Sequence, residues 1–139
     1  MKTIRILFIV AGIAGMSWWF LSETPEPVAS ATGSELVSIT VPDELTSNAE
    51  VGKTIFEAKC TACHGPNAVG QNGVAPPLVH KIYEPSHHAD ESFQRAVALG
   101  VRQHHWSFGD MPPVDGLTRG DVAMIIAYVR ELQQANGIN

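Results

Sequence analysis

The longest hydrophobic run lies at the start of the chain, over residues 6–21, and directly follows the basic residues Lys2 and Arg5. Together with the two residues just before it, this run gives about eighteen residues, just sufficient for a transmembrane helix, which needs roughly 17–25. A tryptophan pair near its end suits the aromatic belt at a membrane interface. The pattern therefore predicts a single N-terminal transmembrane helix within residues 1–21.

A cleavable signal peptide is the alternative interpretation of the same run. Residues 29–31, Ala-Ser-Ala, resemble a peptidase site, although they lie beyond the run and after two prolines. In both interpretations the basic residues stay in the cytoplasm, so everything after Leu21 is exported. We expect an inner-membrane protein whose remaining chain lies on the periplasmic side.

Residues 22–47 differ from the run before them. They hold five acidic and no basic residues, three prolines, and many Ser, Thr and Ala. This composition is typical of a flexible linker, with a coil reach of about 28 Å. A weak alternation over residues 36–41 also allows a short strand. We predict an acidic tether ahead of a globular region over residues 48–139.

Three segments of that region show the three-to-four residue spacing of helices. They begin near Ser47, Asp90 and Thr118, whose side chains are suited to helix N-caps. Gly100 is placed to end the second segment, and Gly137 the third. Each predicted helix has polar residues on one face and an apolar stripe on the other.

The segment between the first two predicted helices, residues 65–85, is rich in Gly and Pro, which predicts a loop. No strand pattern competes in the globular region, so we predict an all-α domain. Loops this long in a small domain need something to pack against, which indicates a cofactor.

Composition and charge narrow the partners. The chain has 139 residues, a mass of 15.0 kDa and a net charge of −5, enough for one modest domain and an appendage. No run of Lys or Arg is present, so nucleic acid is not an expected partner. The region after the linker carries seven basic and nine acidic residues, so strong electrostatic steering is not indicated.

Candidate chemistry is concentrated in the pentapeptide Cys60-Thr61-Ala62-Cys63-His64, which has the spacing of a c-type haem attachment sequence. Two thiols one helical turn apart can each form a thioether with a porphyrin vinyl group. The adjacent His64 is then held as an axial ligand of the iron. We predict one covalently attached haem c.

Zinc binding and thiol redox chemistry are the other uses of this cysteine spacing. A zinc site would need two more ligands at regular spacing, and the chain has no further cysteine. A thioredoxin-like redox pair is expected in a βαβ context, which the pattern lacks. Haem attachment remains the favoured interpretation.

Around this motif the chain resembles the class I c-type cytochromes with one haem, over residues 48–137. GVAPPL at 73–78 is similar to the family's Pro-x-Leu element, and DMPP at 110–113 to the segment that supplies its distal methionine. The resemblance implies a small helical cytochrome c domain over residues 48–139, wrapped around one covalently bound haem. The histidine-rich sequence within residues 79–106 has no counterpart in that family.

The resemblance also implies a close crossing of the first and last helices. Gly52 would fill the glycine position at that contact and face Ile125 and Tyr128. In the same family a proline carbonyl accepts a hydrogen bond from the ligand histidine, which here would join Pro76 and His64, while Leu78 would pack on the porphyrin.

The residues around Met111 also make it the candidate for the second axial ligand, independently of the family resemblance. Pro112 and Pro113 follow it, restrict the backbone and restrain Met111 toward extended geometry, so that a stiff loop presents the thioether. The alternative is that Met111 fills the core and a histidine binds instead. The histidine candidates are His80, His87, His88, His104 and His105.

Two residues after the middle helix are candidates for the haem propionates. The guanidinium of Arg102 and the indole N–H of Trp106 can both donate hydrogen bonds. A solvated surface position for Arg102 and plain core packing for Trp106 are the alternatives. The pairs His87-His88 and His104-His105 also allow a second metal site, although no carboxylate or thiolate pattern supports one.

The expected function follows from the two ligands. With His64 and Met111 both bound, the iron has no open position for a substrate, and thioether ligation raises its potential. We expect a membrane-tethered single-electron carrier, not an enzyme, that has no small-molecule substrate and exchanges electrons with a donor and an acceptor protein. The alternatives are a haem c subunit of a larger membrane oxidoreductase and a haem sensor or enzyme with an open iron position.

Overall fold

The computed structural model of this chain describes residues 33–139. The predicted membrane helix within residues 1–21 and the Ala-Ser-Ala sequence at 29–31 lie outside the described residues. Among the residues that are described, no helix is long and apolar enough to cross a membrane.

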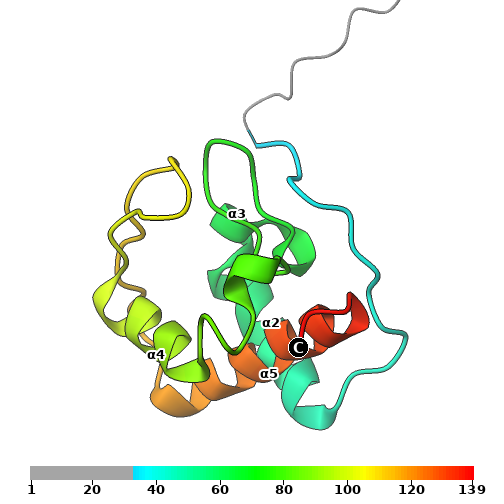
Figure 1. The fold of residues 1–139 in the computed structure, drawn as a ribbon. Coiled ribbons are helices and arrows are strands. Elements are labelled where there is room, and N and C mark those ends of the chain that lie inside the picture. Colours follow the sequence, from blue (N-terminus) through cyan, green and yellow to red (C-terminus); the bar gives the residue numbers. More distant parts are fainter. Residues whose placement is uncertain (1–32) are drawn as a thin grey trace, which may run out of the picture.

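Four α-helices and two short 3-10 helices make up the described chain (Figure 1). Their bounds are α2 Ser47–Lys59, α3 Thr61–His64, η1 Pro66–Ala68, η2 Lys81–Tyr83, α4 Asp90–Leu99 and α5 Arg119–Ala135. Over residues 33–139 the only β pairings are isolated bridges, which confirms the all-α prediction there. The short strand allowed over residues 36–41 is wrong, because none of these residues forms a β bridge, and the adjacent Glu35 forms only an isolated one with Gln71.

The first and last helices of the domain, α2 and α5, cross in direct contact, and Gly52 lies at the crossing as predicted. A Cβ atom added to Gly52 would lie 1.9 Å from the Met124 carbonyl oxygen and 3.0 Å from the Ile125 nitrogen. Beside this point the rings of Phe56 and Tyr128 meet edge to face, with centroids 5.7 Å apart. Two backbones approach this closely only where one residue lacks a side chain.

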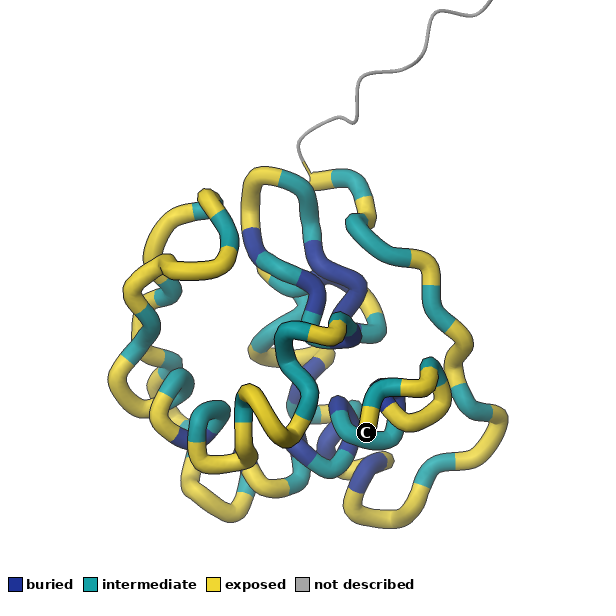
Figure 2. The backbone as a smooth tube through the Cα atoms, viewed as in Figure 1, coloured by how far each residue is buried: buried dark blue, intermediate teal, exposed yellow. Residues whose placement is uncertain are grey.

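The hydrophobic core forms around this crossing, where Figure 2 shows the buried residues gathered in the middle of the fold. The stripe predicted for the last helix is its buried face. It comprises Val122, Ile125, Ile126, Val129 and Leu132. The loop after α3 adds Ala68 and Val79 to the same buried set, so the long loop is anchored by a few apolar side chains.

The N-caps of the first two predicted helices differ from expectation by one residue. Thr46, not Ser47, caps α2, because Thr46 has extended backbone angles and its Oγ1 accepts a hydrogen bond from the Ala49 N–H at 3.4 Å. Asp90 lies in the first turn of α4 after the cap residue Ala89. Its carboxylate is paired with Arg130 of α5 at 2.9 Å, so it joins two helices instead of capping one.

Both ends of α5 match the predicted signals. Thr118 and Asp121 form a reciprocal capping box at its start. At its end the N–H of Gly137 donates to the Gln134 carbonyl and the N–H of Ile138 to the Gln133 carbonyl, with Gly137 at φ +74°. This is a Schellman motif, which stops the helix at Ala135, two residues before the glycine.

Residues 33–46 run along the outside of the helical domain and lead into α2 (Figure 1). The Thr40 N–H and carbonyl pair with the side-chain amide of Asn136, at 2.8 and 2.7 Å. Ile39 and Leu45 pack against the core. Residues 22–32 of the predicted linker lie outside the described residues, and the part from Gly33 onward is docked on the domain, because these side chains and backbone groups find partners there.

Candidate haem site

The attachment motif folds as one continuous turn of helix after α2. Cys60 ends α2, with its N–H on the Phe56 carbonyl at 2.8 Å, and also begins α3. The N–H groups of Cys63 and His64 both donate to the Cys60 carbonyl, at 3.1 and 2.9 Å. Cys60 and Cys63 are therefore one turn apart, the spacing that attachment to two vinyl groups needs.

Both thiols are free. Burial, and after it the neighbouring Cys63, raises the pKa of the half-buried Cys60 thiol to about 11. Cys60 is thus held as a thiol at neutral pH, whereas Cys63 is exposed to solvent.

Gln71 holds the short helix in place, a role that the sequence did not reveal. Its Nε2 lies 3.2, 2.9 and 3.1 Å from the carbonyl oxygens of Thr61, Ala62 and Cys63. The Thr61 carbonyl also accepts the Gly65 N–H at 3.0 Å. The last carbonyls of a helix have no backbone donor within it, so Gln71 supplies one to Ala62 and Cys63. A glutamine in a Gly-rich loop carries no periodic signal, so only the fold identifies it.

His64 is oriented by the loop that follows it. Its ring Nδ1 lies 2.9 Å from the Pro76 carbonyl oxygen, the hydrogen bond predicted from the family resemblance. An Nδ1–H that donates to this carbonyl leaves Nε2 as the unprotonated nitrogen. Burial lowers the pKa of the His64 imidazole against the opposing effect of the Pro76 bond, so the neutral ring, which can bind a metal, is favoured.

The loop that carries Met111 is fixed through its backbone. Val101 and Met111 exchange two hydrogen bonds of 2.9 Å. Just before them, Gly100 has φ +75°, and a Cβ there would lie 2.5 Å from the Met111 carbonyl oxygen. The position of Met111 therefore depends on this bridge and on Gly100 as well as on the two prolines after it.

The cytochrome c family matches this chain over residues 49–133. The chain belongs to the cytochrome c family. No curated protein matches it. The match runs from the start of α2 to near the end of α5 and contains both cysteines, so the cytochrome c domain is a haem-based electron-transfer domain, and covalently bound haem c is its family's cofactor.

Trp106 shows that the folded chain suits this cofactor. Burial raises the pKa of Tyr83 to about 12, and the Trp106 indole near its phenol acts against this rise. No hydrogen bond of ordinary geometry joins them, and the indole N–H is buried without a partner among the described residues. Because an unpaired buried donor costs about 1–3 kcal/mol, this N–H fits an acceptor such as a haem carboxylate.

The other two predicted haem contacts in this cytochrome c domain, Leu78 and Arg102, differ in how far they are buried. Leu78 is half-buried against the core, with its N–H on the Ala68 carbonyl at 2.8 Å. Arg102 lies exposed on the surface, in agreement with the solvated interpretation, and its carbonyl oxygen is 2.9 Å from His104 Nδ1. The contacts of Leu78 and Arg102 with a porphyrin stay predictions.

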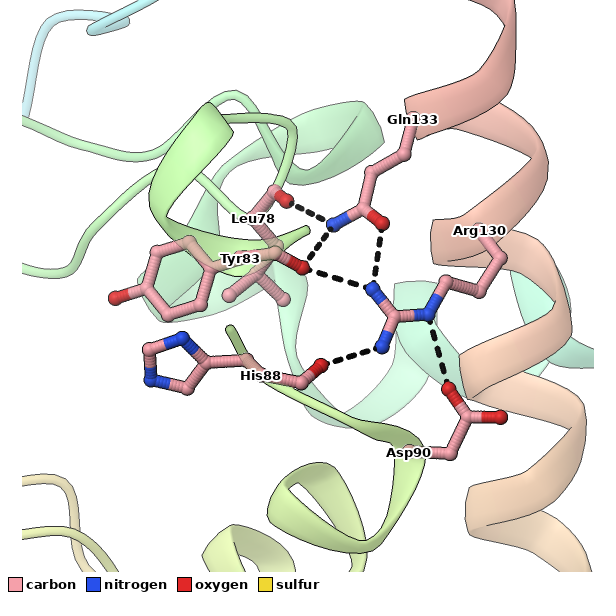
Figure 3. A network of polar contacts seen from close by, with 6 residues as sticks. All are labelled: Leu78, Tyr83, His88, Asp90, Arg130 and Gln133. Atoms are coloured by element: carbon pink, nitrogen blue, oxygen red, sulfur yellow. Dashed lines mark hydrogen bonds and ion pairs between the residues drawn. The ribbon is translucent and has the colours of Figure 1, made fainter. Parts of the chain in front are cut away.

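A polar network from α5 supports the loop after the motif (Figure 3). Arg130 donates from Nη1 to the Tyr83 carbonyl at 2.8 Å and from Nη2 to the His88 carbonyl at 2.6 Å. The fully buried Gln133 donates to the carbonyls of Leu78 and Tyr83 at 2.8 and 3.0 Å. Two polar side chains of one helix thus hold residues 78–88 in place. No sequence motif predicts this role of Arg130 and Gln133.

Proposed function

We propose that this cytochrome c domain is a one-electron carrier in which Cys60 and Cys63 attach a single haem c while His64 and Met111 bind its iron from the two sides. When bound, haem c supplies an iron centre that changes its charge by one electron. With both axial positions taken by the protein, no position is left for a reactant. The proposed role is therefore transfer between redox proteins and not catalysis on a small molecule.

The observation that carries this proposal is the hydrogen bond between His64 Nδ1 and the Pro76 carbonyl. A metal-binding histidine almost always donates its other ring N–H to such an acceptor, which fixes both the tautomer and the orientation of the ring. Here the ring is also next to Cys63 in the same helical turn, so thioether attachment would bring an iron to its free nitrogen.

Met111 is supported as the second ligand by the rigidity of its loop. The two-hydrogen-bond bridge to Val101 and the close approach of Gly100 restrain the backbone from one side, and two prolines restrain it from the other. A soft thioether ligand stabilises ferrous iron and raises the reduction potential.

Paired methionine variants test this assignment. Met111→Leu should keep covalent haem but lower the reduction potential by on the order of 100 mV, within the roughly 0.8 V range that axial ligands span. Met124→Leu makes the same chemical change in α5 and should leave the potential unchanged. An equal potential in the wild type and Met111→Leu would exclude Met111 as a ligand. The mass of the purified chain, with or without one haem, tests attachment separately.

We further propose that the domain is held at the periplasmic face of the inner membrane by residues 1–21 and meets its donor and acceptor in small, transient contacts. The support is the uncharged run over 6–21 behind Lys2 and Arg5. The full chain should sediment with membranes, and a chain that starts at residue 22 behind a cleavable export signal should not. Recovery of the full chain in the soluble periplasmic fraction with an N-terminus near residue 32 would contradict the anchor.

A further inference from the structure

Four histidines gather at one place on the surface, although they come from two separate loops. His87 and His88 lie just before α4, and His104 and His105 lie in the loop after it. The His105 ring centroid is 5.3 Å from that of His87, 5.2 Å from that of His88 and 4.3 Å from that of His104. The loop after α4 therefore turns back to meet the loop before it, and the contact consists of imidazoles.

We infer that His87, His88 and His105 form a binding site for a divalent transition-metal ion such as Zn²⁺, separate from the haem site. One potential ligand atom of each residue lies within 4.8 Å of the other two. Three nitrogens at about 2.0–2.1 Å from a tetrahedral zinc are about 3.3 Å apart. Closing the difference requires shifts of about 1 Å in side chains, two of which are exposed. Water or His104 would complete the coordination.

His88 is the best-prepared of these ligands. Its Nδ1 lies 2.7 Å from the Ile82 carbonyl oxygen, so the ring donates there and Nε2 remains free to bind. Its own backbone carbonyl is held by Arg130 at 2.6 Å. This is the arrangement seen at His64, in which a backbone carbonyl fixes the tautomer of a ligand. His104 repeats it, with Nδ1 2.9 Å from the Arg102 carbonyl.

The donor set selects the class of metal. Three or four neutral imidazoles suit zinc or copper, whereas calcium and magnesium require oxygen ligands. The carboxylate of Glu84, which is close enough to His87 to interact electrostatically, is paired with Lys81. The site therefore presents nitrogen ligands without a competing oxygen cage.

His80 provides a matched control because it is a histidine in the same loop with a different environment. Its Nδ1 accepts the Ile82 N–H at 3.2 Å, and its ring meets Trp106 edge to face at 5.3 Å. Replacement of His80 removes one imidazole from the chain and leaves the cluster complete.

Calorimetric titration of the full haem-loaded chain with Zn²⁺ alone, on protein purified without a histidine tag, tests the site. We expect one Zn²⁺ per chain, an affinity at least about tenfold weaker in His88→Gln and in His105→Gln, and an unchanged affinity in His80→Gln. Circular dichroism of each variant establishes that it is folded.

Three results would overturn the inference. One is the absence of stoichiometric Zn²⁺ binding to the wild type. Another is equal affinity in the wild type and in the triple variant His87→Gln, His88→Gln, His105→Gln. The third is loss of the low-spin haem absorption spectrum in that triple variant, since these imidazoles would then be haem ligands. An unchanged haem spectrum together with lost Zn²⁺ binding supports a separate site, whatever the outcome for Met111.

Discussion

At the scale of single residues, the contact between α2 and α5 depends on the absence of one side chain. A Cβ on Gly52 would lie 1.9 Å from the Met124 carbonyl oxygen, and neither atom belongs to a flexible group that can move aside. Because Cys60 ends the same helix, any displacement of α2 is transmitted to the attachment motif.

Gly52→Ala should therefore destabilise the domain by about 3 kcal/mol or more, since overpacking in a rigid contact forces the backbones apart. The free energy of unfolding, measured in denaturant on the haem-loaded protein, gives the value. Gly120→Ala in the first turn of α5 is the matched control, because its Cβ would meet only Thr118 Oγ1 at 3.5 Å. The control should be neutral or more stable by about 0.5–1 kcal/mol. Equal stability of the two variants would mean that α2 and α5 can move apart at the crossing without a cost in stability.

Residues that act through covalent chemistry or close packing could be predicted at this scale, and residues that bind backbone groups of distant segments could not. The spacing of Cys60, Cys63 and His64 reports their purpose directly, because the reaction requires it. Gln71 and Gln133 bind carbonyls of distant segments, and such partners leave no trace in the local pattern. The sequence shows the two histidine pairs that allow a second metal site, but that the pairs meet is visible only in the fold.

At the scale of elements, the start of α5 is stabilised by two side chains that bind each other. Thr118 Oγ1 accepts the Asp121 N–H at 3.2 Å, and the Asp121 carboxylate accepts the Thr118 N–H at 2.8 Å and its hydroxyl at 2.7 Å. The hydroxyl, followed by the backbone N–H, holds the pKa of Asp121 below its usual value of 3.8. The folded state thus binds this proton less readily than the unfolded state.

Thr118→Ala should lower the free energy of unfolding at pH 7 by about 1 kcal/mol, because the orphan N–H groups of the helix lose their acceptor. Since the pKa of Asp121 is depressed on folding, its contribution is complete above pH 3.8 and is lost as the pH falls through the lower folded value. The difference between wild type and variant should therefore shrink in acid. Urea unfolding across pH measures it.

Thr54→Ala is the control for the capping variant. Thr54 lies exposed on α2 and donates only back to the Glu50 carbonyl at 3.2 Å, so its loss should change stability by less than about 0.5 kcal/mol. A cost at Thr54 equal to that at Thr118 would show that the capping box contributes nothing specific.

The helix starts show why elements are predicted better than their ends. The apolar periodicity of α2, α4 and α5 fixes their existence, because one face of each must be buried. The position of the N-cap depends on which of several adjacent polar side chains accepts a hydrogen bond from an N–H of the first turn. Thr46 does so in place of Ser47, and Asp90 is drawn away by Arg130 of another helix.

At the scale of the whole molecule, α5 holds the segment over residues 78–88 as well as the core. Arg130 and Gln133 bind three carbonyls of residues 78–88, and Arg130 also reaches Asp90 at the start of α4. The backbone at Leu78 and the backbone at His88, a member of the histidine cluster, are thus held by the same helix.

Arg130→Met should cost about 2–4 kcal/mol, because the Tyr83 and His88 carbonyls lose a charged donor while the buried stem is kept. Amide hydrogen exchange should accelerate within residues 78–90 more than in α2. Arg95→Met, on the exposed side of α4, should change neither quantity. Uniform acceleration across the domain would indicate that the network acts on global stability alone.

The docking of residues 33–46 could not be predicted, for a reason that belongs to this scale. Their two core contacts, Ile39 and Leu45, are too far apart to form a periodic pattern, and their hydrogen-bond partner Asn136 is 96 residues away from Thr40. An acidic, Pro-containing composition describes the segment by itself, whereas its position depends on a surface that exists only after the helices have assembled.

That docking has a consequence for the surface around the attachment motif. The Gly33 N–H donates to the Asn72 carbonyl at 2.8 Å, and the neighbouring Gln71 binds the Ala62 and Cys63 carbonyls. Gly33, the first described residue, is therefore fixed close to the corner where the exposed Cys63 lies. On the proposed function, a redox partner that approached the exposed Cys63 would therefore also meet the surface formed by Gly33 and Asn72.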